Sequence, residues 1–508
     1  MQEISSSRIR IFVILLFTVV GFAIYIPILG NGFLSDDYDS LYRIYIQKRI
    51  LYKEFLRPMI DISFYFNYLI SGLSAWSYYL FNISVHVINA LLVFRFAAGF
   101  VLFSKKDQWL FAFASGLLFL IYPFHNESVA WLSGRLSSMA CLFALVSLII
   151  INERQGKLTS IISAIFFLLG LLCYESIFFL PGIILILQWL KGRSVKNLFI
   201  HSVFWLSVIS VYLLIRFLSS REITGDYGSR LSDNHYLQKC LNAGKIFGRL
   251  FLPGSERQSL LITLTIVIGF FVILVTGIIL RNKNQNRVHK IKWISLMAFT
   301  LISLLIPIAF GVSTRTSEGE RLLYFPSCFI CMLLIATIMM IFRNAGIRLL
   351  CFSGISIYFL CFLEINNMRW VKASMAAKSI LETVRNRGAK NVVLINVPDE
   401  LEGAFIFRNG LAKALEINKA DSSTVKIINY LKRVDYLKRG ETIPIKMRDS
   451  TLVIYPECSI VLHPGQYIQL TNTENNSSIS LRKDRNLMYY WNKEALIDIF
   501  RDSTDRKR

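Results

Sequence analysis

Apolar residues gather along the chain into long runs that are separated by short polar breaks. Each run holds about 16 to 25 mostly apolar residues, a length that lets a helix cross the hydrocarbon core of a bilayer. The runs begin near Ile11, Tyr79, Gln108, Leu136, Leu158, Ser176, Leu198, Gln258, Trp293, Ser327 and Leu349. The pattern therefore predicts a mainly α fold, a polytopic bundle of about eleven transmembrane helices.

After about residue 366 the long runs end and shorter apolar segments follow, several of them closed by proline as strands before turns are. The expected elements are strands at 391–398, 451–456 and 459–462, and helices at 375–387 and 425–433. The sequence thus predicts a transmembrane domain over 1–365, with outward loops at 30–77 and 219–257, and a small soluble α/β domain over 366–508. We find no tetratricopeptide spacing and no internal repeat.

Composition supports this division and excludes an ordinary soluble enzyme. Of the residues, 54% are hydrophobic and 18% charged, with a formal net charge of +23. A basic balance of this size can indicate a nucleic-acid partner, but such proteins place Lys and Arg on a wettable face. Here the charges lie between apolar runs, so we expect the lipid bilayer, and no nucleic acid, as the partner.

The positions of the charges predict the orientation of the chain. With a cytoplasmic N-terminus, the inward connections are rich in Lys and Arg and poor in acids, as the positive-inside rule requires. An odd number of spans then places the domain after residue 366 outside the cytoplasm. Nearly all acids of the membrane half fall on outward segments, which argues for an outward-facing polar site.

Asp36 and Asp37 stand side by side directly after the first span. Adjacent carboxylates repel, so at least one needs a cation, a metal or a changed protonation state, and a general base for an acceptor hydroxyl can use such a setting. The alternative is that Ser35 and Asp36 cap a following helix. A divalent metal at Asp37 is optional.

Arginines near the predicted outer boundary are candidates for binding phosphate. Arg135 stands at the mouth of an apolar helix, where a guanidinium offers several donors to phosphate oxygens. Arg57 has the alternative of snorkelling to the interface. Glu320 and Arg321 have the alternative of a structural ion pair.

Two histidines also lie in or between the spans. Asn82, His86 and Asn89 have near-helical spacing, which favours an interhelical hydrogen-bond network over a catalytic His86. His125 and Glu127 match a metal site only loosely, and donor binding is the better interpretation.

In order along residues 10 to 340, these pieces resemble the GT-C class of polytopic glycosyltransferases, particularly the O-mannosyltransferase branch with transmembrane and tetratricopeptide regions. The matching pieces are Asp36-Asp37, Arg57-Pro58, Asn82 to His86, Pro123-x-His125-x-Glu127-x-Val129-x-Trp131-x-x-Gly134-Arg135, Glu175 before Pro181, and Glu320-Arg321-x-x-Tyr324-x-Pro326-Ser327. Two features depart from that branch. Tyr174 stands before Glu175 where the branch commonly has a lysine, and the tail shows no tetratricopeptide repeats. The tail, including residues 403–410, is similar to uncharacterised bacterial relatives, which implies a bacterial inner membrane with a periplasmic site.

The resemblance implies transfer of a sugar from a polyprenyl-phosphate donor to a protein or a cell-surface glycan or lipid, with inversion. It implies Asp36 as the base and Asp37 as its partner or as a ligand for acceptor or metal. It further implies a donor site that combines phosphate clamps with residues shaping the sugar pocket: Arg57, Arg135, Arg321, His125, Glu127, Glu175, Glu320 and Tyr324.

Two other functions stay open. A transporter or flippase of lipid-linked sugars would also place charges at membrane depth, although repeated halves and broken midplane helices, which such proteins often show, are not evident in the sequence. A non-catalytic envelope assembly protein is the third possibility.

Overall fold

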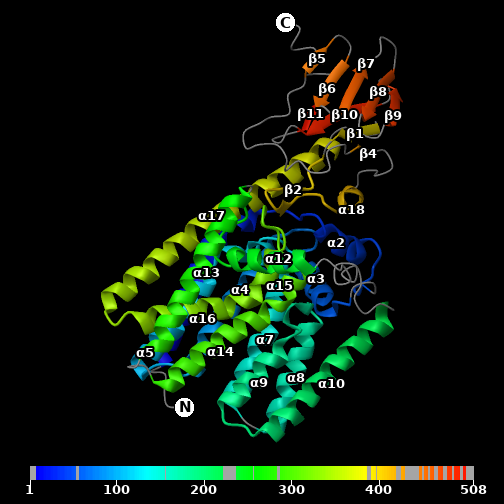
Figure 1. The fold of residues 1–508 in the computed structure, drawn as a ribbon. Coiled ribbons are helices and arrows are strands. Elements are labelled where there is room, and N and C mark those ends of the chain that lie inside the picture. Colours follow the sequence, from blue (N-terminus) through cyan, green and yellow to red (C-terminus); the bar gives the residue numbers. More distant parts are fainter. Residues whose placement is uncertain are drawn as a thin grey trace. The chain divides into compact units, whose positions relative to one another are not determined.

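The computed structural model of the 508-residue chain is mainly helical (Figure 1). It describes residues 7–52, 56–154, 156–220, 236–255, 257–282, 286–385, 391–395 and 397–418, together with the strands of the remaining C-terminal part. The chain divides into two compact units. Unit 1 comprises Met1–Leu29 and Ile50–Met368, and unit 2 comprises Gly30–Arg49 and Arg369–Arg508.

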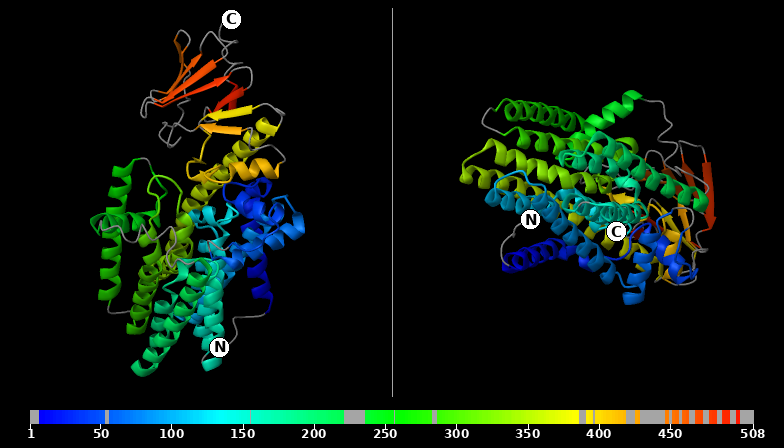
Figure 2. Two further views of the ribbon diagram at one scale, coloured as in Figure 1. Left: turned by 90° about the vertical axis from the view of Figure 1, so that its right-hand side faces the viewer. Right: turned by 90° about the horizontal axis from the view of Figure 1, so that it is seen from below.

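Unit 1 is a bundle of helices that run side by side (Figure 2). Its longer helices are α1 (Ser7–Tyr25), α3 (Pro58–Ser71), α4 (Trp76–Gly99), α5 (Lys105–Leu120), α7 (Arg135–Glu153), α8 (Lys157–Leu171), α9 (Leu180–Leu190), α10 (Val195–Ser220), α12 (Tyr236–Arg249), α13 (Gln258–Arg281), α14 (Arg287–Ser303), α16 (Tyr324–Ile341) and the first part of α17 (Ala345–Arg385). Its short helices are η1 (Ile26–Gly30), η2 (Pro123–His125), α6 (Asn126–Val129), η3 (Glu175–Ile177), α15 (Leu305–Phe310) and η5 (Glu320–Leu323).

The protein is an integral, multi-pass membrane protein, as the apolar runs predict. Among the described residues, eight helices are long and apolar enough to cross a membrane, or nine if one bent pair counts as a span. The apolar helices Lys157–Leu171 and Glu175–Leu190 are shorter. All the predicted runs fall on helices, but the count of about eleven stays a prediction because it includes these two and the bent pair.

The bent pair joins Lys105–Leu120 to Pro123–Val129 at an angle of 51°. Proline has no N–H to donate and forces the residue before it out of the helical region. Tyr122 accordingly has extended backbone angles, with ψ 126°. Because of this break, the short helix α6, which carries Glu127, is inclined to α5 and does not continue it.

Small residues let the central helices of unit 1 approach closely, as is common in membrane bundles. A Cβ on Gly116 of α5 would lie 2.9 Å from the carbonyl oxygen of Ala90 and 2.9 Å from the ring of Phe17. α1, α4 and α5 therefore meet at this glycine. α10 and α13 instead expose long rows of apolar side chains, which suits helices that face lipid.

Unit 2 combines α2 (Asp37–Tyr45), the end of α17 and α18 (Leu411–Ile417) with three sheets. In the first, β1 (Asn391–Ile395) pairs in parallel with β10 (Asn486–Trp491) and β4 (Val425–Ile428), and β11 (Leu496–Asp498) is antiparallel to β10. β2 (Glu400–Leu401) and β3 (Ala404–Phe405) form a hairpin. The third is an antiparallel sheet of β5 (Lys446–Arg448), β6 (Thr451–Tyr455), β7 (Cys458–Leu462), β8 (Tyr467–Asn472) and β9 (Ser477–Arg482).

The predicted strands at 391–398, 451–456 and 459–462 correspond to β1, β6 and β7. The predicted helix at 425–433 is wrong where the structure describes it, because Val425–Ile428 is the strand β4. Its β-branched residues suit a strand that can pair with β1. The rest of that predicted helix lies outside the described residues.

Residues 30–49 form the other unexpected feature of unit 2. This part of the first loop packs with the C-terminal residues, since α2 contacts α18. Within unit 2, Gly32 N donates to Ser374 Oγ at 2.8 Å and Lys378 Nζ donates to the Gly30 carbonyl at 2.8 Å. The loop that carries Asp36 and Asp37 is therefore part of the unit formed by the tail.

Candidate functional site

Four residues form an ion-pair cluster in unit 1 around a single carboxylate. Glu175 begins η3 just after α8. Arg216 Nη1 donates to Glu175 Oε1, and Arg57 Nη2 lies 3.5 Å from Glu175 Oε2. Tyr212 OH donates to Oε1 at 3.4 Å and accepts from Arg216 Nη1 at 3.1 Å. We call Arg57, Glu175, Tyr212 and Arg216 the Glu175 cluster; it joins the start of α3, η3 and α10.

The cluster keeps partial access to solvent. The side chain of Arg57 is 19% exposed and that of Glu175 is 16% exposed. The Arg57 guanidinium lies 5.0 Å from the centre of the Tyr174 ring, a stacking that suits its planar form. Its separation from Glu175 exceeds the roughly 2.7 to 2.9 Å of a strong charge-assisted hydrogen bond. A guanidinium offers several donors in a planar fork, a geometry that suits the oxygens of a phosphate.

An apolar groove of about 220 Å³ lies between α8 and α10. It is lined by Ile161, Ala164, Ile165, Leu168, Phe204, Ser207, Val208 and Val211. Val211 is followed by Tyr212, a member of the Glu175 cluster. The lining of the groove on α10 thus ends next in sequence to a residue of the polar cluster, and an apolar groove with a nearby polar cluster suits a ligand with an apolar chain and an anionic head.

Glu127 and Arg321 form a second ion pair in unit 1. The backbone N–H of Arg321 donates to Glu127 Oε2 at 2.9 Å, and its Nη1 donates to Oε1. The Glu127 side chain is fully buried, whereas Arg321 is 20% exposed and lies over the Trp131 ring. A Cβ on Gly134 would stand 1.8 Å from the Glu127 carbonyl oxygen, so only glycine fits there. The pair joins two predicted motifs that are far apart in sequence.

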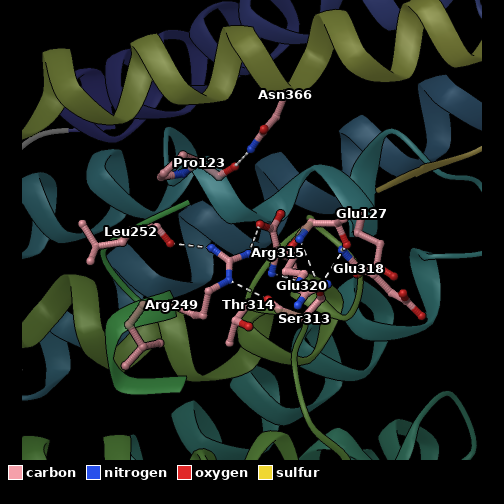
Figure 3. A network of polar contacts seen from close by, with 12 residues as sticks. Pro123, Glu127, Arg249, Leu252, Ser313, Thr314, Arg315, Glu318, Glu320 and Asn366 are labelled. Carbon is pink, nitrogen blue, oxygen red and sulfur yellow. Dashed lines mark hydrogen bonds and ion pairs between the residues drawn. The ribbon is translucent and has the colours of Figure 1, made fainter. Parts of the chain in front are cut away.

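Arg249 and Glu320 form a third, fully enclosed ion pair (Figure 3). Arg249 Nη2 donates to Glu320 Oε1, Nε donates to the Ser313 carbonyl at 2.9 Å, and Nη1 donates to the Leu252 carbonyl. These contacts fix the loop before η5 to the end of α12. The structure thus shows Glu320 paired with Arg249 and Arg321 paired with Glu127.

Arg135 has a different environment from the one expected at a helix mouth. It is completely buried. Its guanidinium donates to Ser63 Oγ at 3.2 Å, to Asn67 Oδ1 at 2.6 Å and to the carbonyls of Leu132 and Tyr78 at 3.1 and 3.2 Å. These partners are protein groups that need a buried donor. The buried side chain of Arg135 therefore connects the start of α7 to α3 and α4.

The predicted interhelical network around His86 is present in unit 1. His86 Nε2 faces the Leu120 carbonyl at 3.1 Å, so the neutral ring carries its proton there and Nδ1 accepts from Tyr324 OH at 2.7 Å. Asn89 Nδ2 donates to the same hydroxyl at 3.1 Å and to the Ser138 carbonyl at 2.8 Å. The groups are fully buried, so Tyr324 belongs to this network.

His125 lies in the same aromatic core. Its ring is 4.3 Å from the Tyr324 ring and 4.6 Å from the Phe119 ring, measured between centroids. Ser327 Oγ donates to the Tyr324 carbonyl at 2.6 Å, so it accepts from His125 Nε2 at 2.7 Å. His125 and Tyr324, predicted to shape the sugar site, are thus placed inside the bundle without exposure.

In unit 2, Asp36 and Asp37 have opposite environments. Asp37 is fully buried, and its Oδ2 accepts the Leu34 N–H at 3.0 Å. Asp36 is half-buried, and its Oδ1 accepts from Asn409 Nδ2 at 2.9 Å. Asp36 precedes α2 but its side chain makes no capping hydrogen bond, so the capping alternative does not describe it. Asp36 is the accessible member of the pair, and Asp37 fixes the turn.

No cluster of three or more His, Cys, Asp or Glu side chains suited to a metal ion is present in the described part of the chain. Asp37 already uses one carboxylate oxygen for the Leu34 N–H.

The sequence analysis did not identify Tyr212, Arg216, Arg249 or Asn409. Arg216 stands near the end of an apolar run and Arg249 at the end of an amphipathic helix, and a lone arginine at either place is common. Asn409 lies in the tail, 373 residues from the Asp36 that it binds. An arginine that interrupts the outer end of a predicted span was the available signal for Arg216.

No protein-family model matches the chain. Protein O-mannosyl-transferase TMTC2 of Mus musculus is 38% identical over 93 residues, 18% of this chain and 10% of that protein. Protein O-mannosyl-transferase F38B6.6 of Caenorhabditis elegans is 23% identical over 365 residues, 64% of this chain and 51% of that protein. The chain thus spans about half or less of the length of these relatives. The matches confirm the resemblance that the motifs carry.

Two solved structures are similar. ArnT from Cupriavidus metallidurans bound to undecaprenyl phosphate has a TM-score of 0.44 at 10% identity, covering 82% of this chain and 89% of that chain. Arabinofuranosyltransferase AftD from Mycobacteria has a TM-score of 0.43 at 12% identity, covering 84% of this chain and 32% of that chain.

Proposed function

We propose that this protein is a membrane-embedded glycosyltransferase, of hexosyltransferase type, that moves a sugar from a polyprenyl-phosphate donor to an acceptor. The observation that carries the proposal is the Glu175 cluster beside the α8–α10 groove. The similarity to named O-mannosyl-transferases supports the reaction class. Mannose is one candidate sugar, and the acceptor is a protein or a cell-surface glycan or lipid.

The donor chemistry follows from the cluster and the groove. A polyprenyl phosphate has a long hydrocarbon tail and an anionic head. The apolar lining of the groove suits the tail, and the donors of Arg57 and Arg216 suit the phosphate oxygens. As the sugar leaves, negative charge grows on the phosphate, and guanidinium groups that bind this charge more tightly than the ground state lower the barrier.

Asp36 is the proposed base. Its carboxylate takes the proton of the acceptor hydroxyl while that oxygen bonds to the anomeric carbon and the carbon–oxygen bond to the phosphate breaks. The bonding electrons leave with the polyprenyl phosphate. A single displacement of this kind inverts the anomeric centre. The partial exposure of Asp36 supports this role, and the burial of Asp37 favours an indirect role for that residue.

The remaining predicted residues act around the donor in this proposal. Arg321, which is 20% exposed and fixed by Glu127, is the second candidate phosphate contact. Glu320 holds the adjoining loop through Arg249. Arg135, His125 and Tyr324 act indirectly, by holding the helices that carry these groups.

The reaction takes place at the outer face of a bacterial inner membrane in this proposal. Basic residues such as Lys191, whose Nζ donates to the Ile151 carbonyl at the end of α7 at 2.8 Å, lie at the end of the bundle opposite the start of that helix. By the positive-inside rule that end is cytoplasmic. Glu175 and Arg216 would then lie toward the periplasm, where the sugar of a translocated donor is presented.

A flippase would use the same groove and the same arginines, so bond cleavage decides between the two functions. Purified protein in liposomes should release free undecaprenyl phosphate from undecaprenyl-phosphate-linked hexoses when an acceptor extract is added. Asp36→Asn should slow the release strongly, because the base is lost. Arg315→Ala, which removes an exposed arginine outside the cluster, should leave it unchanged. Movement of intact donor between leaflets without release would indicate a flippase, and neither result would indicate an assembly protein.

A further inference from the structure

Asp36 is held by a segment of the tail that follows β3. Asn409 Nδ2 donates to Asp36 Oδ1 at 2.9 Å, and Ser35 Oγ lies 3.4 Å from the same oxygen. We call residues 406–410 the Asn409 loop. The contact joins residues 373 positions apart. Both belong to unit 2, so the carboxylate is oriented by the unit in which it lies.

The turn before Asp36 and the Asn409 loop are fixed to each other by backbone as well as side chain. Ser35 N donates to the Ile406 carbonyl at 2.9 Å, and Asn409 N donates to Ser35 Oγ at 3.2 Å. Ser35 has φ 46°, a left-handed conformation that a serine adopts only where its surroundings hold it. The Asn409 loop therefore maintains the strained turn that presents Asp36.

Gly410 makes this close approach feasible. It has φ +84°, and a Cβ at this position would lie 2.5 Å from the Ser35 carbonyl oxygen. Only glycine combines this backbone conformation with this proximity. Contacts on either side extend the interface, since Lys413 Nζ lies 2.9 Å from Asp39 Oδ1 and the rings of Tyr38 and Phe407 stack.

We propose that Asn409 is a positioning residue for the base, so that the tail supplies part of the catalytic machinery; this rests on the proposed function. Its amide holds one oxygen of Asp36, and the other oxygen is then directed to the acceptor hydroxyl. The residues that do this lie outside residues 10–340, where the resemblance to the O-mannosyltransferase branch is found. In this protein the tail thus takes part in the transfer step.

Asn409→Ala tests the proposal in the full-length protein. We expect kcat to fall about 10- to 100-fold, because a misplaced base loses rate while donor binding persists, and the KM for the donor to stay unchanged. Asn409→Gln, which keeps the amide, should recover part of the loss. Asn409→Ala should also add little to Asp36→Asn, since both act on one group. Asn418→Ala is the matched control, because Asn418 Nδ2 bonds only locally, to the Ala414 carbonyl at 2.7 Å.

A second measurement does not depend on turnover. Hydrogen exchange of the Ser35 amide, which bonds to Ile406, should accelerate in Gly410→Ala. Unchanged kcat in Asn409→Ala, or an equal loss in Asn418→Ala, would overturn the positioning role. Unchanged exchange at Ser35 would show that the Asn409 loop does not hold the turn. If the wild-type protein releases no polyprenyl phosphate, the proposed function fails, and the exchange result then decides separately whether the loop holds Asp36.

Discussion

Arg135 and Arg57 both lie in unit 1, and the sequence predicts that both bind phosphate. Their surroundings in the structure differ. Arg135 is fully buried and gives its donors to Ser63, Asn67 and two carbonyls of the protein. Arg57 is partly exposed, lies over an aromatic ring and is 3.5 Å from Glu175. For Arg135, whose guanidinium donates to buried protein groups, we propose a role in maintaining the fold. For the partly exposed Arg57, which pairs with Glu175, we propose a role in binding the donor.

The largest expected effect is on folding. Arg135→Ala leaves the Asn67 side chain and the Leu132 and Tyr78 carbonyls without their buried donor, which should cost about 2 to 4 kcal/mol of stability. Thermal unfolding in detergent measures this, with Arg315→Ala as the exposed control. If Arg135→Ala had normal stability but weakened donor binding, Arg135 would contact the donor phosphate instead of maintaining the fold.

Gly134, which directly precedes Arg135, gives a second test of the close packing at the start of α7. A methyl group at Gly134 would stand 1.8 Å from the Glu127 carbonyl oxygen, so Gly134→Ala must displace α6 or α7 and should cost about 1 to 3 kcal/mol or more. Gly182→Ala is the matched control, since its nearest neighbours are side-chain atoms of Ile302 at an ordinary 3.6 Å. Equal thermal stability of the two variants would contradict the close packing described for Gly134.

The Glu175 cluster should respond in activity rather than in stability. Arg57→Ala and Arg216→Ala should each lower kcat/KM for the lipid-linked donor about 10- to 100-fold, because a charge-assisted contact to the departing phosphate is lost. Arg57→Lys should recover less than half of the lost transition-state free energy, since lysine lacks the planar fork. For Arg57, which is 19% exposed, the unfolding temperature should change little. A large loss of stability with normal turnover would make this site structural too.

The smallest effect is expected for an ion pair elsewhere in unit 1. Arg95 Nε lies 2.6 Å from Glu153 Oε1, and the Arg95 side chain is 46% exposed. Exposed pairs of this kind contribute about 0 to 1 kcal/mol, so Arg95→Ala should leave stability and transfer close to wild type. A strong loss of transfer in this variant would show that exposed arginines in general, and not the Glu175 cluster, govern activity.

The helices of unit 1 could be predicted from the sequence. The partners of their polar side chains could not. Long apolar runs predict spans because the length of the bilayer core is fixed. The local pattern of Val425–Ile428 predicts a helix, but the segment is a strand. Its partner β1 lies some thirty residues earlier in the chain, so the pairing cannot be predicted from the local sequence.

The site shows the same limit at the level of single residues. Asp36, Arg57 and Glu175 can be singled out as candidates because charge is conspicuous beside apolar runs, and their roles stay predictions. Whether an arginine faces the core, as Arg135 does, or solvent depends on the rotation of its helix, which packing decides. The contact between Asn409 and Asp36 depends on the folding of the tail against the first loop, so no local signal predicts it.

We propose that the Glu175 cluster binds the phosphate of a sugar donor and that the protein cleaves the bond between that phosphate and the sugar. The most direct test compares, in proteoliposomes with acceptor extract, the release of free undecaprenyl phosphate by wild-type protein and by the Arg57→Ala/Arg216→Ala double variant. We predict release by the wild type and at least about a 100-fold slower release by the folded double variant. Equal rates for the two proteins would contradict phosphate binding by the Glu175 cluster, and no release by the wild type with any hexose donor would contradict the transferase function.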